Sequence, residues 1–379
     1  MKQNYEAVSL RSEGVAKAKY LFIGSTAQYS GKTATTFGIT QQLRQKGISL
    51  AYSKPLGFCS ELNPQPSPED ADVNFITKAL QLSSHQVKPP FICLNEATIA
   101  QQLQKTDNMK PSNTLLDYYQ DLDADLVLLE GPSSLAEGSL FNMSVSHMAD
   151  ELEASVLLVT RCKSPALLVV DELLAAKQEL GDRLVGIFIN DIPLEHLDGM
   201  QTIVKPFLEK QGISVLGLLP HNSLLNSVSV RELTQQLNAR VLCRSDRLDL
   251  MVESLVIGAM NVNSALEYFR KGRNMAVVTG GDRPELQLSA LETSTNCLIL
   301  TGHSQPQDFI LNRAEDLEIP ILSVDLDTLT TVEIADRAFG HVRLQEQIKV
   351  DCIQELMQDC FDGERLIAQL GLNPAVSAS

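Results

Sequence analysis

The chain has 379 residues, of which 44% are hydrophobic and 21% charged; this is typical of a soluble globular protein of more than one domain and excludes a disordered chain. The formal charge is −16, from 31 basic and 47 acidic residues, which argues against nucleic acid or an anionic membrane surface as a partner. We therefore expect small molecules or other proteins as partners.

The seven cysteines are scattered and form no C-x-x-C pair, so the sequence suggests neither a zinc site nor a disulfide framework. We expect buried, reduced thiols in a cytoplasmic protein. Residues 1–18 are a polar lead-in, and no later apolar run reaches the length that spans a membrane. The sequence thus predicts neither an export signal nor a membrane anchor.

A phosphate-binding loop is predicted at residues 23–33, between an apolar strand at 20–23 and a helix at 35–46 that stops at a glycine. In such a loop, backbone N–H groups and the positive end of the helix dipole converge on a polyphosphate. Lys32 would reach the outer phosphates, and the hydroxyl of Thr33 would ligate Mg²⁺.

The match depends on the run Ser30-Gly31-Lys32-Thr33, because one usual feature is missing. The glycine expected five positions before Gly31 is replaced by Thr26, and the available glycine, Gly24, lies two residues earlier. An ordinary strand-to-helix turn with a surface lysine is the alternative.

A second strand is predicted at 48–52, with Lys54 at its exit. Since ligands collect at the carboxyl ends of parallel strands, Lys54 would lie beside the loop; a plain surface lysine is equally compatible. Residues 63–72 form a proline-rich loop that ends in Glu69-Asp70-Ala71-Asp72 before a helix at 73–82. Asp70 and Asp72 would either favour the helix N-terminus or hold Mg²⁺ through water.

The apolar run that ends at Glu130 predicts a strand buried on both faces. A carboxylate there is costly unless it serves an ion or a hydrogen-bond network. We expect Glu130 to ligate a metal or its water, with a structural cap of the following turn as the alternative.

Alternation of apolar strands with helices continues to Pro220 and predicts a doubly wound, mainly parallel sheet. The strands are expected at 155–160, 184–190 and 213–219, and the helices include 164–180 and 201–212. Asn190, at a strand exit, would either read a base edge or form a turn with residues 191–193.

A second, smaller α/β domain is predicted after Pro220. It would contain one long helix at 248–268, with Met251, Leu255 and Met260 in its core, and strands at 275–279, 297–301 and 319–324. The turn Gly280-Gly281-Asp282-Arg283 would either bind an effector through Arg283 or be a tight turn with Asp282 as a helix cap.

The order of these motifs resembles the dethiobiotin synthetase fold over residues 18–222. The quoted motifs are Gly31-Lys32-Thr33, Tyr52-Ser53-Lys54-Pro55, the Asp-rich turn, Leu128-Leu129-Glu130-Gly131, Ile189-Asn190 and Gly217-Leu218-Leu219-Pro220. The part with residues 278–283 is similar to the DRTGG domain. Together the two parts look like the N-terminal regulatory half of long bacterial phosphotransacetylases, without a segment for the acetyltransferase domain.

We expect a first domain at 19–222, a second domain at 223–365 and a tail at 366–379, whose small residues from 373 onward would be frayed. The resemblance implies that Lys32 and Thr33 hold ATP and Mg²⁺ and that Lys54 contacts the reacting groups. It also implies that Asp70 or Asp72, together with Glu130, binds Mg²⁺ and that Asn190 reads adenine. The loop is one residue longer than in the synthetase, and Pro132-Ser133-Ser134 replaces its Gly-rich turn. Phosphate binding survives these departures more readily than recognition of the synthetase's substrate.

Three functions remain open from the sequence. The first is a regulatory or sensor protein that binds ATP, or another nucleoside triphosphate, with Mg²⁺ and a small effector in the second domain. The second is an ATP-dependent enzyme that activates or phosphorylates a carboxylate with Lys32 and Lys54 as catalytic groups. The third is a structural adaptor with a vestigial loop; by the resemblance, the chain is at least a dimer.

Overall fold

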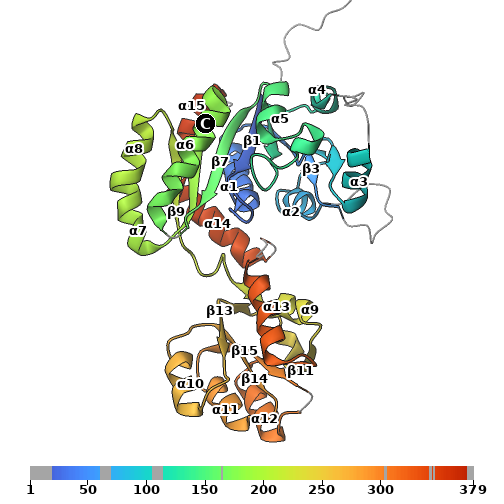
Figure 1. Cartoon of the computed structure of the whole chain (residues 1–379), viewed down its shortest axis with the longest axis vertical. Coiled ribbons are helices and arrows are strands. Elements are labelled where there is room, and N and C mark those ends of the chain that lie inside the picture. Colours follow the sequence, from blue (N-terminus) through green and yellow to red (C-terminus); the bar gives the residue numbers. More distant parts are fainter. Residues whose placement is uncertain are drawn as a thin grey trace, which may run out of the picture. The chain divides into compact units, whose positions relative to one another are not determined.

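The computed structural model describes residues 19–59, 70–104, 114–163, 165–302, 305–340, 344 and 346–373. The chain divides into two compact units, one of residues 1–220 with 354–379 and one of residues 221–353 (Figure 1). The predicted polar lead-in, and the prolines and Glu69 of the predicted loop, lie outside the described residues. Within the described ranges, no helix is both long and apolar enough to cross a membrane.

The first unit contains a seven-stranded sheet in the order β4-β2-β6-β1-β7-β8-β9, in which every neighbouring pair is parallel. The strands are β1 (Lys19–Ser25), β2 (Leu50–Ser53), β4 (Val87–Lys88), β6 (Leu126–Glu130), β7 (Ser155–Arg161), β8 (Leu184–Ile192) and β9 (Val215–Pro220). All five residues of β6 are buried, which confirms the predicted strand with two covered faces.

Helices follow most strands of this sheet, as parallel pairing requires a crossover between them. They are α1 (Lys32–Gln45), α2 (Ala71–Ala79), α3 (Glu96–Gln104), α4 (Leu115–Tyr119), α5 (Val145–Glu151), α6 (Val169–Leu180), α7 (Leu194–Gly199) and α8 (Lys205–Lys210). Tyr20 and Phe22 of β1 share a core with Met148 of α5 and Leu173 of α6. Leu21 and Ile23 alternate with them and therefore point to the opposite face. The predicted α/β fold is confirmed.

The second unit contains a mixed five-stranded sheet in the order β11-β16-β15-β14-β13. Its strands are β11 (Arg240–Cys243), β13 (Ser254–Ile257), β14 (Met275–Gly280), β15 (Thr295–Thr301) and β16 (Ile321–Val324), of which only β11 is antiparallel to its neighbour. Its helices are α9 (Val230–Gln236), α10 (Val262–Phe269), α11 (Pro284–Leu291), α12 (Asp308–Asp316) and α13 (Thr328–Gly340).

The single helix predicted at 248–268 is wrong. The segment forms β12 (Met251–Val252), which pairs with β10 (Val228–Ser229), then β13 and all of α10 except Phe269. Pairing of residues 254–257 with β14 outweighs their helical pattern, and the side chain of Asn261 starts α10 by accepting from Ser264 N–H. The three residues expected in that helix's core, Met251, Leu255 and Met260, are only partly buried.

The C-terminal segment belongs to the first unit, which differs from the predicted domain end at 365 and the predicted tail at 366–379. The unit boundary falls inside α14 (Gln347–Cys360), and α15 (Gly363–Leu370) buries Leu366, Ile367 and Leu370. Arg365 of α15 donates two hydrogen bonds of 2.7 Å to the carboxylate of Glu209. Residues 374–379 lie outside the described residues.

The expectation that all cysteines are buried, reduced thiols is also wrong. Cys59 and Cys93 form a disulfide at the end of the two-stranded ribbon of β3 (Leu56–Gly57) and β5 (Ile92–Cys93). Of the five cysteines outside this disulfide, Cys352 and Cys360 are half-buried. Sequence spacing did not indicate the disulfide because its partners are 34 residues apart and meet only through the ribbon.

Candidate functional site: a P-loop and its carboxylate cluster

The loop between β1 and α1 lies at the carboxyl end of the central strand of the sheet (Figure 1). Gly31, the residue before α1, has φ of +91°, and a Cβ at this position would lie 2.2 Å from Nδ2 of Asn190. Both the backbone conformation and the space therefore require glycine. Asn190 in turn donates from Nδ2 to the carbonyl of Ser30 at 3.0 Å, so it holds the loop's backbone.

Lys32 folds back over the loop, and its Nζ donates to Oγ of Ser25 at 2.9 Å. Ser25 donates to the carbonyl of Ser133 at 2.9 Å, which ties the loop to the segment after β6. Burial lowers the pKa of Lys32, although the nearby Glu130 opposes the shift. A bound polyanion would reverse this shift because it favours the charged ammonium group.

Two residues of the loop are fixed by hydroxyl contacts. Ser30 is 1% exposed and donates to the carbonyl of Ala27 at 2.6 Å. Thr26, which stands where the usual pattern has glycine, has its Oγ1 3.0 Å from Oγ1 of Thr160 in β7. The unusual threonine thus anchors the loop to the neighbouring strand.

Glu130 ends β6 with only 1% exposure and accepts two side-chain hydrogen bonds. Oγ1 of Thr33 donates to Oε1 at 2.9 Å, and the hydroxyl of Tyr52 donates to Oε2 at 3.0 Å. Burial and the charge of Asp72 raise the pKa of Glu130 to about 7, against the effect of Lys54. These contacts join Glu130 to the loop threonine.

Lys54 is buried and forms ion pairs with Asp70, at 3.0 Å, and with Asp72. Burial alone would lower the pKa of Lys54, but Glu130, Asp72 and Asp70 together raise it above the ordinary value. Asp70 also caps α2, since its side chain accepts from the N–H groups of Asp72 and Val73. The helix-capping role expected as one alternative for Asp70 is therefore observed.

Thr33 and Glu130 supply the oxygen chemistry that Mg²⁺ prefers, and Mg²⁺ completes its shell with phosphate oxygens and water. Their contact beside Lys32 fits a metal held together with a polyphosphate. Asp70 and Asp72 instead form ion pairs with Lys54. In the described part of the chain, no group of three or more His, Cys, Asp or Glu side chains is arranged so that it could hold a metal ion by itself.

The turn Gly280-Gly281-Asp282-Arg283 connects β14 to α11 in the second unit. Arg283 precedes α11 without a side-chain cap and donates to the carbonyl of Met260 at 3.4 Å, so the expected cap by Asp282 is not observed. Gln287 is fully buried and donates from Nε2 to the carbonyl of Gly280 at 2.9 Å. Among the described residues its Oε1 has no hydrogen-bond partner.

Sequence reasoning missed three groups of the first site. Tyr52 looked like an ordinary strand residue, while Ser133 and Glu137 lie in the segment after β6 that differs from the synthetase pattern. The N–H and the hydroxyl of Ser133 both donate to Oε2 of Glu137. The only signal for Tyr52 was its place in the strand beside the one that ends in Glu130.

A Gly-Lys-Thr loop between the central strand and its helix, in an all-parallel sheet, defines a P-loop α/β protein. The chain belongs to the AAA domain family, which matches residues 19–229, and the DRTGG domain family matches residues 232–338. The motif order had indicated both parts, and the two matches confirm them.

Phosphate acetyltransferase of Synechocystis sp. is 24% identical over 369 residues, which are 92% of this chain and 51% of that protein. ATP-dependent dethiobiotin synthetase of Nitrosopumilus maritimus is 21% identical over 220 residues, 57% of this chain and 94% of that enzyme. A third match is a structure of the CBS and DRTGG domains of the regulatory region of Clostridium perfringens pyrophosphatase, complexed with its activator diadenosine tetraphosphate. It has a TM-score of 0.26 and 17% identity, and the match covers 38% of this chain and 70% of that chain.

The chain is thus related to the N-terminal half of phosphate acetyltransferases. The match to the Synechocystis protein covers most of this chain but only about half the length of that relative.

Proposed function

We propose that the first unit binds a nucleoside triphosphate, ATP with Mg²⁺, and that the protein acts as a regulator or sensor that also binds a small effector in the second unit. The observation that carries the proposal is the grouping of Lys32, Thr33 and Glu130 around a glycine-dependent loop. Lys32 would neutralise the outer phosphates, and Thr33 and Glu130 would hold Mg²⁺.

The effector site would lie at the turn Gly280-Gly281-Asp282-Arg283, at the carboxyl ends of the parallel strands β13, β14 and β15. The buried Oε1 of Gln287 supports this because an unpaired buried acceptor costs free energy that a ligand donor would recover. The exposed guanidinium of Arg283 would pair with a phosphate or carboxylate of the effector.

Thermal unfolding with and without Mg²⁺-ATP tests the nucleotide. A ligand at one hundred times its dissociation constant stabilises the native state by about 2.7 kcal/mol, which gives a measurable rise in melting temperature. GTP, ADP and Mg²⁺ alone are the matched additions. If none of the nucleotides raises the melting temperature, the proposed nucleotide site is wrong.

An ATP-dependent enzyme is the second candidate, and the buried Lys54 beside the loop favours it. Lys54 is poised among Asp70, Asp72 and Glu130, where it could orient an acceptor carboxylate. Release of ADP that depends on a carboxylate substrate and disappears in Lys32→Ala would support this candidate. ADP formation equal to the buffer rate across a carboxylate panel would exclude it.

The remaining proposals concern assembly. The chain would form at least a dimer, as the resemblance to the synthetase implies, and a monomer by light scattering would contradict this. A cytoplasmic location, expected from the sequence, is proposed as well. A structural adaptor with a vestigial loop would instead keep partner binding unchanged in Lys32→Ala.

A further inference from the structure

A cavity of about 350 Å³ lies in the first unit between the residue after β3, the start of α3 and residues 137–141. This volume is within the range of small-molecule sites. Its polar wall includes Glu137, which accepts from Ser133, and Ser133 in turn accepts from the loop residue Ser25. The cavity is therefore linked to the P-loop through two hydrogen bonds but is lined by different residues.

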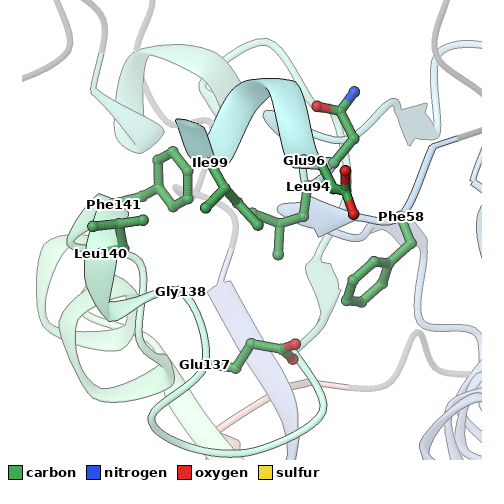
Figure 2. Close-up of a pocket in the computed structure, with 9 residues that line it drawn as sticks. Phe58, Leu94, Glu96, Ile99, Glu137, Gly138, Leu140 and Phe141 are labelled. Carbon is green, nitrogen blue, oxygen red and sulfur yellow. The ribbon is translucent and has the colours of Figure 1, made fainter. Parts of the chain in front are cut away.

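The body of the cavity is apolar. Figure 2 shows Leu94 and Ile99 between the rings of Phe58 and Phe141, with the carboxylate of Glu137 facing them from the other side. Phe58 is 55% exposed and Ile99 is 39% exposed, so large apolar side chains remain open to solvent on this one concave surface. A concave, mainly apolar lining of this kind suits the apolar body of a small ligand.

The charge of the lining is one-sided. Glu96 and Glu137 both line the cavity, and its described lining contains no basic side chain. Oε2 of Glu137 is held by the hydroxyl of Ser133 at 2.6 Å, so this carboxylate has a fixed direction. Two carboxylates repel a phosphate or carboxylate ligand, whereas carboxylates and aromatic rings together attract an ammonium group.

We propose that this cavity binds a small molecule with an apolar body and a positively charged ammonium group. The apolar body lies against Leu94 and Ile99, and the ammonium group pairs with Glu137, while Glu96 adds negative charge to the lining. The proposal does not depend on nucleotide binding, because the polyphosphate and this ligand have opposite charges and different contacts.

The test uses three probes of similar size and different charge: 2-phenylethylammonium, 2-phenylethanol and phenylacetate. Binding to the full-length protein without nucleotide is measured by calorimetry, or by ligand-observed NMR where heats are small. We expect the ammonium probe to bind about tenfold or more tightly than the alcohol, and phenylacetate not to bind. Equal binding of the ammonium and the alcohol, or no binding of the ammonium probe, would overturn the proposal.

Substitutions in the lining test whether the probes bind in this cavity. Glu137→Gln should weaken binding of the ammonium probe by about tenfold, and Glu96→Gln should weaken it by about threefold. Glu179→Gln is the control, because Glu179 is an exposed glutamate of α6 that does not line the cavity. It removes the same charge and should leave binding of the probe unchanged. Phe141→Ala should weaken all probes that bind, and it keeps the test valid if Glu137→Gln disturbs the loop. Unchanged affinity in Glu96→Gln, Glu137→Gln and Phe141→Ala would overturn the assignment to this cavity. Mg²⁺-ATP binding to the same variants reports separately on the nucleotide site.

Discussion

At the start of α1, the side chain of Asn190 packs against the glycine of the P-loop. Gly31 has φ of +91°, and its missing Cβ leaves the room that Nδ2 of Asn190 occupies while it donates to Ser30. Asn190 was expected to read a base or form a turn. Its observed contact instead supports the loop, a role that sequence could not show because 160 positions separate the two partners.

Gly31→Ala should therefore destabilise the protein by more than the strain of a positive φ alone, which is about 1–2 kcal/mol for alanine. The matched control is Gly212→Ala, because Gly212 has φ of +74° and open space around its Cβ position. Urea unfolding measures both variants, and Asn190→Ala in the Gly31→Ala background should recover part of the difference. Equal losses in the two glycine variants would contradict the steric account.

A pH dependence follows from Glu130, whose pKa rises from 4.5 to about 7 on burial. Between these two values the native state holds a proton that the unfolded state releases, so the contribution of Glu130 to stability falls as the pH rises through this window. Glu130→Gln cannot ionise. Without Mg²⁺, its stability relative to wild type should increase by up to about 3 kcal/mol from pH 5 to pH 8.

Denaturant unfolding in EDTA across this pH range measures the difference. Glu137→Gln is a suitable control because Glu137 is also a half-buried glutamate near Lys32. A stability difference between Glu130→Gln and wild type that stays constant from pH 5 to pH 8 would mean that Glu130 keeps an ordinary pKa.

Sequence reasoning placed Lys32, Thr33 and Glu130 together because the carboxyl ends of parallel strands meet at one edge. Their mutual contact in the structure agrees with that argument. It could not place Tyr52, because an aromatic residue in an apolar strand looks like core, and only the register of β2 with β6 brings its hydroxyl to Glu130.

At the scale of elements, the ribbon of β3 and β5 has two residues in each strand, which is too short to be stable alone. The Cys59–Cys93 disulfide closes it, and Phe58 beside it donates its N–H to Asp70 at 2.9 Å. The crosslink thus helps to position the carboxylate that pairs with Lys54.

Reduction by a thiol reagent should lower the free energy of unfolding by about 3–4 kcal/mol, the range for a loop of this length. It should also speed hydrogen exchange at the amides of Ile92 and Leu94, which donate to the carbonyls of Pro55 and Gly57. Cys59→Ser should reproduce both effects, while Cys360→Ser, at a half-buried free cysteine, should not. Unchanged exchange after verified reduction would show that the ribbon holds without its crosslink.

The error at 248–268 shows where local pattern fails. A run rich in Met, Val, Ile and Ala suits either a helix or a buried strand, and the two differ only in what they pack against. Parallel pairing of β13 with β14 decides the outcome, and such pairing between distant segments is not encoded in the local spacing of apolar residues.

At the scale of the whole chain, the first unit depends on residues that return to it after the second. Gly38 of α1 leaves room for Met357, since a Cβ at this position would lie 2.4 Å from Cγ of Met357, and Gln42 donates to the carbonyl of Met357. Nζ of Lys19 donates to the carbonyl of Gly371 at 2.7 Å. Sequence reasoning assumed that each domain is one continuous segment and so missed this return.

A chain that stops at residue 353 should therefore lose the cooperative unfolding of the first unit, because it leaves apolar surface of α1 and β9 uncovered. Residues 221–353 are retained in this truncation and should keep their own transition. Calorimetry of the full and shortened chains measures both transitions. A first-unit transition at the same temperature in the shortened chain would show that residues 354–379 are dispensable.

The central claim, that Lys32 and its neighbours form a working nucleotide site, is tested most directly by titrating Mg²⁺-ATP into the wild-type protein and into Lys32→Ala in a calorimeter. The account predicts saturable binding that is lost in Lys32→Ala, followed by a flat baseline, as expected for a sensor. Continuing heat after each wild-type injection would mean turnover and favour the enzyme. Absence of heat in the wild type, or equal binding by Lys32→Ala, would contradict the account.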